Sequence, residues 1–186
     1  GETLGTSAVT GTAAVTTTAT LTSPATTYVI TPALGDLAAA NYAFATFTDG
    51  VLTVGQKALT VTADAKTKVY GAANPALTAT ITGFANGETL ATSGVTGAAS
   101  VTTTATALTG VGSATLTAAV GNLVSANYAF TFTDGALTIT KAPLTVTANP
   151  VGRVYGAANP TFTATLAGFV NSETLATSGV TGTAAA

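Results

Sequence analysis

The acidic side chains are the main candidates for chemistry in this sequence, because its 186 residues include no His, Cys, Met or Trp. Without an imidazole or a thiolate, the chain lacks the commonest general bases, nucleophiles and transition-metal ligands of enzymes. The serines have no histidine to activate them, and no Gly-x-Ser-x-Gly turn occurs. We therefore predict that the chain is not an enzyme, with no catalytic residues and no cofactor.

The acids also suggest calcium, which needs about six to eight oxygen ligands. Asp49 and Asp134 each precede a glycine, a pairing that turn geometry explains. Glutamates recur in the string ETL at Glu2, Glu88 and Glu173, where an acid favours the start of a helical turn. Only a meeting of Glu88 with Asn127 or Asp134 in the folded chain would begin to supply a calcium site. We predict no metal site.

Aromatic residues and lysines raise two further possibilities. An aromatic platform for sugars would draw on Tyr70, Tyr128, Phe130 and Phe132. Alternation places the last three on one face with Leu137 and Ile139, which favours a core role. Lysine–asparagine isopeptide cross-links would draw on Lys57, Lys66, Lys68 and Lys141. Lys57 aligns with Ala142, and Lys141 with Gln56, in the repeat described below. These unmatched lysines argue against cross-links.

Charge and hydropathy restrict the partners and the compartment. The net charge is -2 and only 6% of residues are charged, with the five basic residues scattered singly, so we predict no nucleic-acid binding. No apolar run approaches the length of a membrane span, so we predict no membrane insertion. A Thr- and Ala-rich chain without Cys suits an exported bacterial protein, and we expect an extracellular location at the cell surface. O-linked sugar on Thr16 to Thr18 or Thr102 to Thr104 stays open.

An internal repeat organises the chain. Residues 1–44 match 87–130, and residues 46–101 match 131–186, with shared strings such as NYAF, TFTDG and VYGAANP. A period of about 85 residues is too long for a solenoid coil and suits a small folding module. Pro143 punctuates the junction, with Lys57-Ala58 in that role one repeat earlier. We predict the C-terminal part of a module at 1–56, a complete module at 57–140, and the N-terminal part of a further module at 141–186.

Period-two alternation predicts mostly β-structure. The clearest hairpin is Tyr128 to Thr140, with Asp134-Gly135 in a type I′ turn that sets Phe132 opposite Leu137. In the first copy Ala45 is inserted into this hairpin, and we predict a β-bulge there. Residues 86–90 are compatible with one or two helical turns. Further strands are expected at Leu59–Ala63, Leu77–Phe84, Ala98–Thr104 and Ser113–Ala118.

The ordered set KAPLTVTA, VYGAANP, GFANGETL, NYAF and TDGALTIT resembles the MBG domain of the YGX type, with Tyr70-Gly71 and Tyr155-Gly156 as the namesake pair. This family occurs as repeats in large bacterial surface adhesins and haemagglutinin-like exoproteins. The resemblance implies a β-grasp-like fold, with parallel first and last strands, and supplies no catalytic residues. Ala114 departs from the family pattern, since the first copy has Tyr28 at this position of what resembles the family's Gly-x-Tyr-x-Ile-Thr strand.

Our functional prediction is a structural repeat of a secreted adhesin or extracellular filament, in which tandem β-grasp-like modules with minimal linkers form a stiff rod for adhesion or biofilm. The alternative is a multivalent module with a weak glycan, mucin or polysaccharide site in every repeat. The expected partners are neighbouring modules of the same or an adjacent chain. Residues 141 to about 170 of one chain could complete residues 1–56 of the next by strand addition, or a longer covalent array could supply the missing half.

Overall fold

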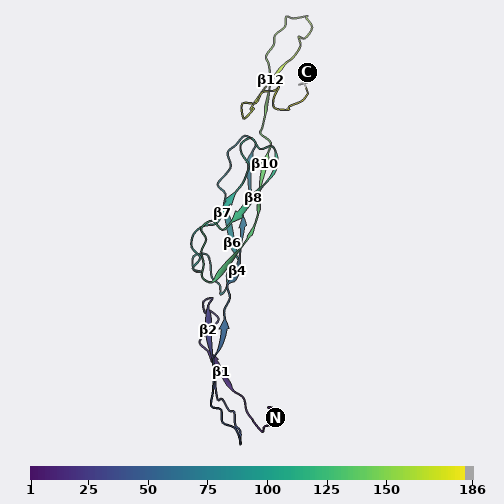
Figure 1. Cartoon of the computed structure of the whole chain (residues 1–186). Helices are drawn as coiled ribbons and strands as arrows, with labels where there is room; N and C mark the ends of the chain where they lie inside the picture. The colour runs from purple at the N-terminus through teal and green to yellow at the C-terminus, as the bar shows by residue number, and fades with distance from the viewer. Residues whose placement is uncertain (183–186) are drawn as a thin grey trace. The chain divides into compact units, whose positions relative to one another are not determined.

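The computed structural model describes residues 1–182, and every regular element in that range is a β-strand (Figure 1). No helix of a length and apolarity that would cross a membrane occurs in this range. The prediction that the chain is mostly β-structure is confirmed. The twelve strands are β1 Ala14–Thr17, β2 Thr27–Ala33, β3 Gly50–Thr53, β4 Lys57–Ala63, β5 Lys66–Val69, β6 Ala79–Thr82, β7 Ser100–Thr102, β8 Gly112–Ala119, β9 Tyr128–Thr133, β10 Gly135–Thr140, β11 Thr145–Ala148 and β12 Ala164–Ala167.

The chain divides into two compact units, each assembled from separate stretches of sequence. The first unit comprises Gly1–Thr60, Ile81–Ala98 and Asn122–Thr131. The second comprises Val61–Thr80, Ala99–Gly121 and the residues from Phe132 onward. Each unit therefore contains residues of more than one repeat copy, so contacts between consecutive copies lie inside a unit.

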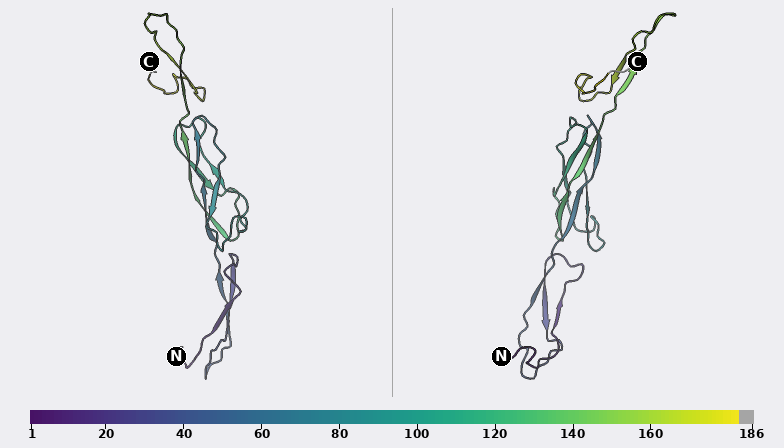
Figure 2. Two further views of the ribbon diagram at one scale, coloured as in Figure 1. Left: turned by 180° about the vertical axis from the view of Figure 1, so that it is seen from behind. Right: turned by 90° about the vertical axis from the view of Figure 1, so that its right-hand side faces the viewer.

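A four-stranded sheet in the order β5-β10-β8-β7 is the main element of the second unit. Strands β5 and β10 are parallel, with Leu137 paired to Lys66, and the other pairs are antiparallel. Figures 1 and 2 show β8 and β10 side by side in this sheet. Strands β11 and β12 form a separate antiparallel pair. A further sheet has the order β6-β4-β9.

The first unit contains an antiparallel sheet in the order β1-β2-β3. Its register reproduces that of β7-β8-β10, since Ala14 pairs with Ala33 as Ser100 pairs with Ala119. The pair Tyr28–Leu52 likewise matches Ala114–Leu137. The substitution of Tyr28 by Ala114 therefore changes the side chain and leaves the pairing unchanged.

The hydrophobic core comes from the middle repeat copy. Leu116, Leu137 and Ile139 are at most 1% exposed and pack with three buried alanines, Ala63, Ala105 and Ala118. Across residues 1–182, every buried hydrophobic side chain lies between Leu59 and Ile139. The alternation predicted for the aromatic residues holds only in part, because Tyr128 is 3% exposed whereas Phe132 is 40% exposed.

The predicted hairpin at Asp134-Gly135 is wrong. Strand β9 lies beside β4, whereas β10 lies between β5 and β8, so the two strands belong to different sheets. Gly135 does not have a positive φ, and the Asp134 carboxylate accepts a hydrogen bond from the Ala118 amide at 3.0 Å. The glycine is required for space, because a Cβ there would lie 3.0 Å from the carbonyl carbon of Ala63 and closer still to its oxygen.

The predicted bulge at Ala45 is also wrong, because residues 42–47 form no strand. Their match in the next copy, β9, is held beside β4. Among residues 1–182 no strand pairs with residues 42–47, and a bulge exists only within a paired ladder.

Residues 86–90 begin with a tight turn and form no helix, and one i-to-i+4 turn follows, in which the Ser93 amide donates to the Thr89 carbonyl at 2.9 Å. Asn86 and Gly87 have φ values of 52° and 72°, and the Glu88 amide donates to the Ala85 carbonyl at 2.8 Å. This is the type I′ geometry that the sequence had suggested for Asp134-Gly135. The predicted strands in this copy are present as β4, β6, β7 and β8, with β6 and β7 shorter than expected.

Candidate functional site

The YGX motif places Tyr70 at the end of the parallel strand pair. Tyr70 directly follows β5, and its amide donates to the Thr140 carbonyl at 2.8 Å, the last residue of β10. The Ala72 amide then donates to the Val69 carbonyl at 3.0 Å, and Gly71 takes the φ of +85° that this turn requires. The backbone therefore fixes the start of the Tyr70 side chain.

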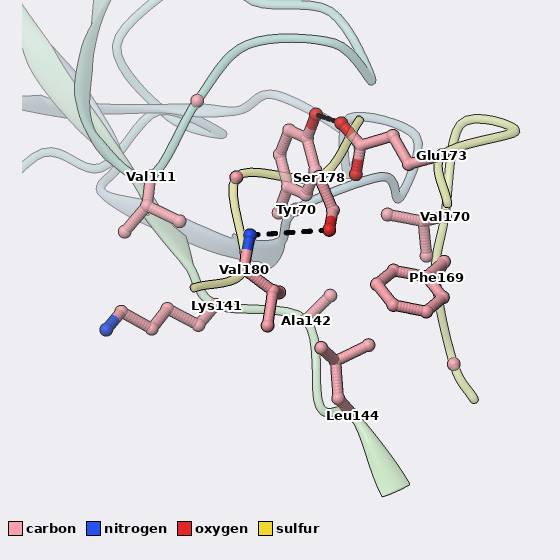
Figure 3. Close-up of a pocket in the computed structure, with 13 residues that line it drawn as sticks. Tyr70, Val111, Lys141, Ala142, Leu144, Phe169, Val170, Glu173, Ser178 and Val180 are labelled. Carbon is pink, nitrogen blue, oxygen red and sulfur yellow. Dashed lines mark hydrogen bonds between the residues drawn. The ribbon is translucent and has the colours of Figure 1, made fainter. Parts of the chain in front are cut away.

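Tyr70 contacts a glutamate of the following repeat copy. Its hydroxyl donates to Glu173 Oε1 at 2.7 Å, as Figure 3 shows. Glu173 is presented by a turn in which Asn171 and Ser172 have φ values of 52° and 61°, closed by a 2.9 Å bond from its own amide to the Val170 carbonyl. This turn is the match of the Asn86-Gly87 turn, with serine in place of glycine. A hydrogen bond to a carboxylate is among the stronger kinds in proteins.

Backbone contacts surround this hydrogen bond. The Gly71 amide and the Asn171 side chain both donate to the Ala107 carbonyl, each at 3.2 Å. Val170 lies directly over Gly71, where a Cβ would stand only 2.6 Å from the Val170 Cβ. Gly71 is thus needed both for its positive φ and for the close approach of the next copy.

A cavity of about 440 Å³ lies beside the Tyr70–Glu173 contact. Figure 3 shows the Lys141 ammonium extending away from the Glu173 carboxylate, so the two charges do not converge on one point. Aromatic and aliphatic side chains form much of the remaining wall. The lining residues are Tyr70, Gly110, Val111, Lys141, Ala142, Leu144, Gly168, Phe169, Val170, Glu173, Ser178, Gly179 and Val180.

A second tyrosine–glutamate contact lies in the first unit, within the middle copy alone. There the Tyr128 hydroxyl donates to Glu88 Oε2 and accepts the Ala85 amide at 2.9 Å. Phe84 packs edge-on against Tyr128, with ring centroids 5.8 Å apart and planes at 79°. A smaller cavity of about 170 Å³ lies alongside. Tyr42 and Glu2 make the same tyrosine–glutamate contact one repeat earlier.

Hydrogen bonds that involve side chains also join the first and second copies. Asn127 Oδ1 accepts the Ala25 amide at 3.0 Å, while the Asn127 carbonyl accepts the Lys57 amide of its own copy at 3.0 Å. Gln56 Nε2 donates to the Ala126 carbonyl at 3.0 Å. Asn127, considered above as a calcium ligand, therefore connects two copies.

Lys68 is a buried cation that the sequence did not reveal. It is 6% exposed, and its Nζ donates to three oxygens at 2.6 to 3.2 Å. The acceptors are the Ala72 and Thr106 carbonyls and the Asn74 side chain. These contacts use all three donors of an ammonium, as a structural cation would. The available signal was its match, Arg153, which keeps the charge and donates to the Ala157 carbonyl at 3.1 Å.

The remaining candidate residues are dispersed. Among residues 1–182 no three acidic side chains gather in a way that could hold a metal ion. Asp134 accepts the Ala118 amide, Glu88 contacts Tyr128, and Asp49 directly precedes β3. The contacts that recur are instead tyrosine–glutamate pairs. ETL and the two tyrosine motifs were visible in the sequence, but which tyrosine reaches which glutamate was not.

The Tyr128–Glu88 contact predicts an alkaline limit on stability. The hydrogen bond to Glu88 raises the pKa of Tyr128 above its usual value of about 10. A raised folded-state pKa means that this contribution is fully present below the unfolded pKa and is lost as pH rises through the folded pKa. We expect the melting temperature of the native chain to fall in that alkaline range more steeply than that of Tyr128→Phe. Tyr155→Phe, at a fully exposed position, is the control and should follow the native profile.

The fold and these contacts define an all-β protein with repeated sequence whose consecutive copies are joined by hydrogen bonds. A family model described as MBG domain (YGX type) matches residues 59–138 and 144–186. The chain therefore belongs to the MBG domain (YGX type) family, as its motifs predicted. This is not a known enzyme family. No match to the chain was found among curated proteins or among solved structures.

Proposed function

We propose that the chain is a load-transmitting structural segment of an extracellular bacterial surface protein, an adhesin stalk or filament, in which each repeat is fastened to the next. The observation that carries this proposal is the hydrogen-bonded contact between consecutive copies at Tyr70–Glu173. Family membership supports a repeat module of surface proteins. In this proposal the segments 1–56, 57–140 and 141–186 are parts of β-grasp-like modules arranged in tandem.

Two features support fastening over a flexible linker. First, β10 ends at Thr140 and β11 begins at Thr145, so few residues separate the strands of successive copies. Second, the Tyr70 amide is bonded to Thr140 while its hydroxyl is bonded to Glu173, so one residue contacts both sides of this connection. Fixing a short connection at several points opposes bending, and the solvent-facing threonines give this stiffness little dependence on salt.

Gly71→Ala tests this junction against a matched control. Gly71 and Gly156 have φ values of +85° and +82°, so alanine at either position carries the same left-handed strain of about 1–2 kcal/mol. At Gly71 the new Cβ also meets Val170, whereas at Gly156 it meets nothing within 4 Å. We expect Gly71→Ala to be more destabilising by a further 1–3 kcal/mol or so, typical of overpacking, in denaturant titrations.

Small-angle X-ray scattering on the same variants measures the mechanical consequence. Gly71→Ala should broaden the distribution of chain dimensions, and Gly156→Ala should not. Adding Val170→Gly to Gly71→Ala should narrow this distribution again, because it removes the Val170 Cβ and both methyl groups that the new Cβ would meet. The left-handed strain at position 71 stays, as it does in Gly156→Ala. If the native chain is already as flexible as Gly71→Ala, the stalk proposal fails.

The alternative function is weak glycan binding in every repeat. The observation in its favour is the cavity beside Tyr70 and Phe169, which combines aromatic faces with the Glu173 carboxylate and recurs in smaller form near Tyr128. Chains of two and of six repeats should be bound to host glycans and immobilised polysaccharides. Avidity that rises steeply with repeat number would favour the binding module. Absence of binding by either chain would favour the stalk.

A further inference from the structure

The two end segments of the chain expose apolar positions that the middle copy buries. Tyr42 is 51% exposed, whereas its match Tyr128 is 3% exposed. Val146 is 59% exposed, whereas its match Val61 is completely buried. Val9, Ile30, Leu52, Val54 and Leu144 are half-buried, and each matches a buried residue of the middle copy. Within the described residues 1–182, these two segments thus carry apolar faces that are exposed where the same sequence is covered in the middle copy.

Each of these two segments contains strands that match the ones the other segment lacks. Residues 1–55 match 87–140 and contain the strands β1-β2-β3, which repeat the register of β7-β8-β10. The middle sheet has one more strand, β5, parallel to β10. The match of β5 is residues 151–154, near the other end of the chain. In the same way residues 42–47 match β9, and β11 matches part of the β4 strand that lies beside β9.

We propose that residues 141–171 of one chain dock on residues 1–56 of a second copy of the same chain and complete a module there. Two ladders form. Residues 151–154 add to the open edge of β3 in parallel, and residues 42–47 pair with β11. The middle copy sets the register, because Leu137–Lys66 and Thr138–Thr67 are partners. The intermolecular partners are accordingly Leu52 with Val151 and Thr53 with Gly152.

The matching cations Lys68 and Arg153 support residues 141–171 as the segment that docks. Lys68 donates to the Ala72 carbonyl within its own loop and to the Thr106 carbonyl across the module. Arg153 already makes the first of these contacts, to Ala157. The match of Thr106 is Thr20, so docking brings the Thr20 carbonyl of the second copy to the guanidinium. Residues 172–182 and 1–11 match the same stretch of the middle copy, so one of these segments is displaced from the completed module.

Association should be visible for the native chain by light scattering during dilution, with the mass falling toward that of a monomer. Head-to-tail docking gives closed rings or open filaments according to whether the rotation between copies closes. Val146→Asp should abolish association, because it places a charge at the match of a fully buried valine while leaving the separate chain almost unaffected. Thr145→Asp is the control, since Thr145 and its match Thr60 are both exposed, and should associate normally.

The absence of Cys allows the register to be tested by cross-linking. Thr53→Cys with Gly152→Cys should yield intermolecular disulfides and a ladder of linked species on non-reducing gels. Thr67→Cys with Thr138→Cys places the same pair inside the middle copy and should link within one chain. Thr16→Cys with Gly152→Cys, which uses the far edge of the β1-β2-β3 sheet, should link no more than Thr53→Cys alone.

A native chain that stays monomeric at every concentration would overturn the proposal. So would assembly that survives Val146→Asp, or cross-linking of equal yield for the Thr53 and Thr16 pairs, because either would place the contact elsewhere.

Discussion

Leu137→Ala is expected to lower the free energy of unfolding by about 2–5 kcal/mol. Leu137 is completely buried in β10, within a cluster that includes Leu116 and Ile139. Removing its isobutyl group loses transfer free energy and leaves a cavity, because β10 is held in place by its pairing with β5 and β8 and the closely packed core cannot fill the space. Denaturant titration followed by far-UV circular dichroism measures the loss.

Leu52→Ala is the matched control for this substitution. Leu52 occupies the same position in the first copy, paired to Tyr28 as Leu137 is paired to Ala114, but is only half-buried. At a dilution where the chain is monomeric, its loss should be clearly smaller, since no closed cavity forms. Equal losses at the two positions would contradict the assignment of the core to the middle copy.

Gly135→Ala should be destabilising by about 1–3 kcal/mol or more, because the new methyl group meets backbone that cannot yield cheaply. Gly135 begins β10 and lies against Ala63, where a Cβ would stand 3.2 Å from the Ala63 Cβ and within clashing distance of its carbonyl oxygen. Relief would require β10 to move away from the end of β4. Thermal unfolding and amide hydrogen exchange across β10 would report the shift.

Gly50→Ala is expected to raise the free energy of unfolding, whereas Gly135→Ala is expected to lower it. Gly50 is the match of Gly135, and a Cβ there makes only ordinary contact with the Ile30 side chain at 3.5 Å. Neither glycine has a positive φ, so the substitution mainly reduces the freedom of the unfolded chain and should stabilise by about 0.4–1 kcal/mol. A loss at Gly50 as large as that at Gly135 would show that the clash with Ala63 is not the cause.

The comparison of these two glycines explains why the hairpin prediction failed. Asp-Gly between alternating strands is a strong local signal for a type I′ turn, and nothing within residues 128–140 contradicts it. The glycine is instead required because the chain passes from one sheet to another close to Ala63. That requirement comes from a residue about seventy positions away, which no local pattern records.

At the candidate site, too, the motifs could be read from the sequence, whereas the pairing of their residues could not. The motifs that contain Tyr70, Tyr128, Glu88 and Glu173 were recognisable, and they indicated the family. Glu88 bonds a tyrosine of its own copy, whereas Glu173 bonds a tyrosine of the preceding copy. In both arrangements the glutamate accepts a hydrogen bond from a tyrosine hydroxyl, through Oε2 of Glu88 and through Oε1 of Glu173. Residue type alone therefore does not predict which tyrosine is the partner.

The repeat, the mostly-β class and the membership of the MBG family could be predicted without coordinates, because alternation, turn residues and recurring strings are local properties of the chain. The tertiary structure alone decided which strands are neighbours, which copy is buried, and that Lys68 and Gly71 are held by distant backbone. Strand pairing and close packing depend on contacts between residues far apart in the chain, where many partners with the same apolar character compete and only the folded geometry selects one.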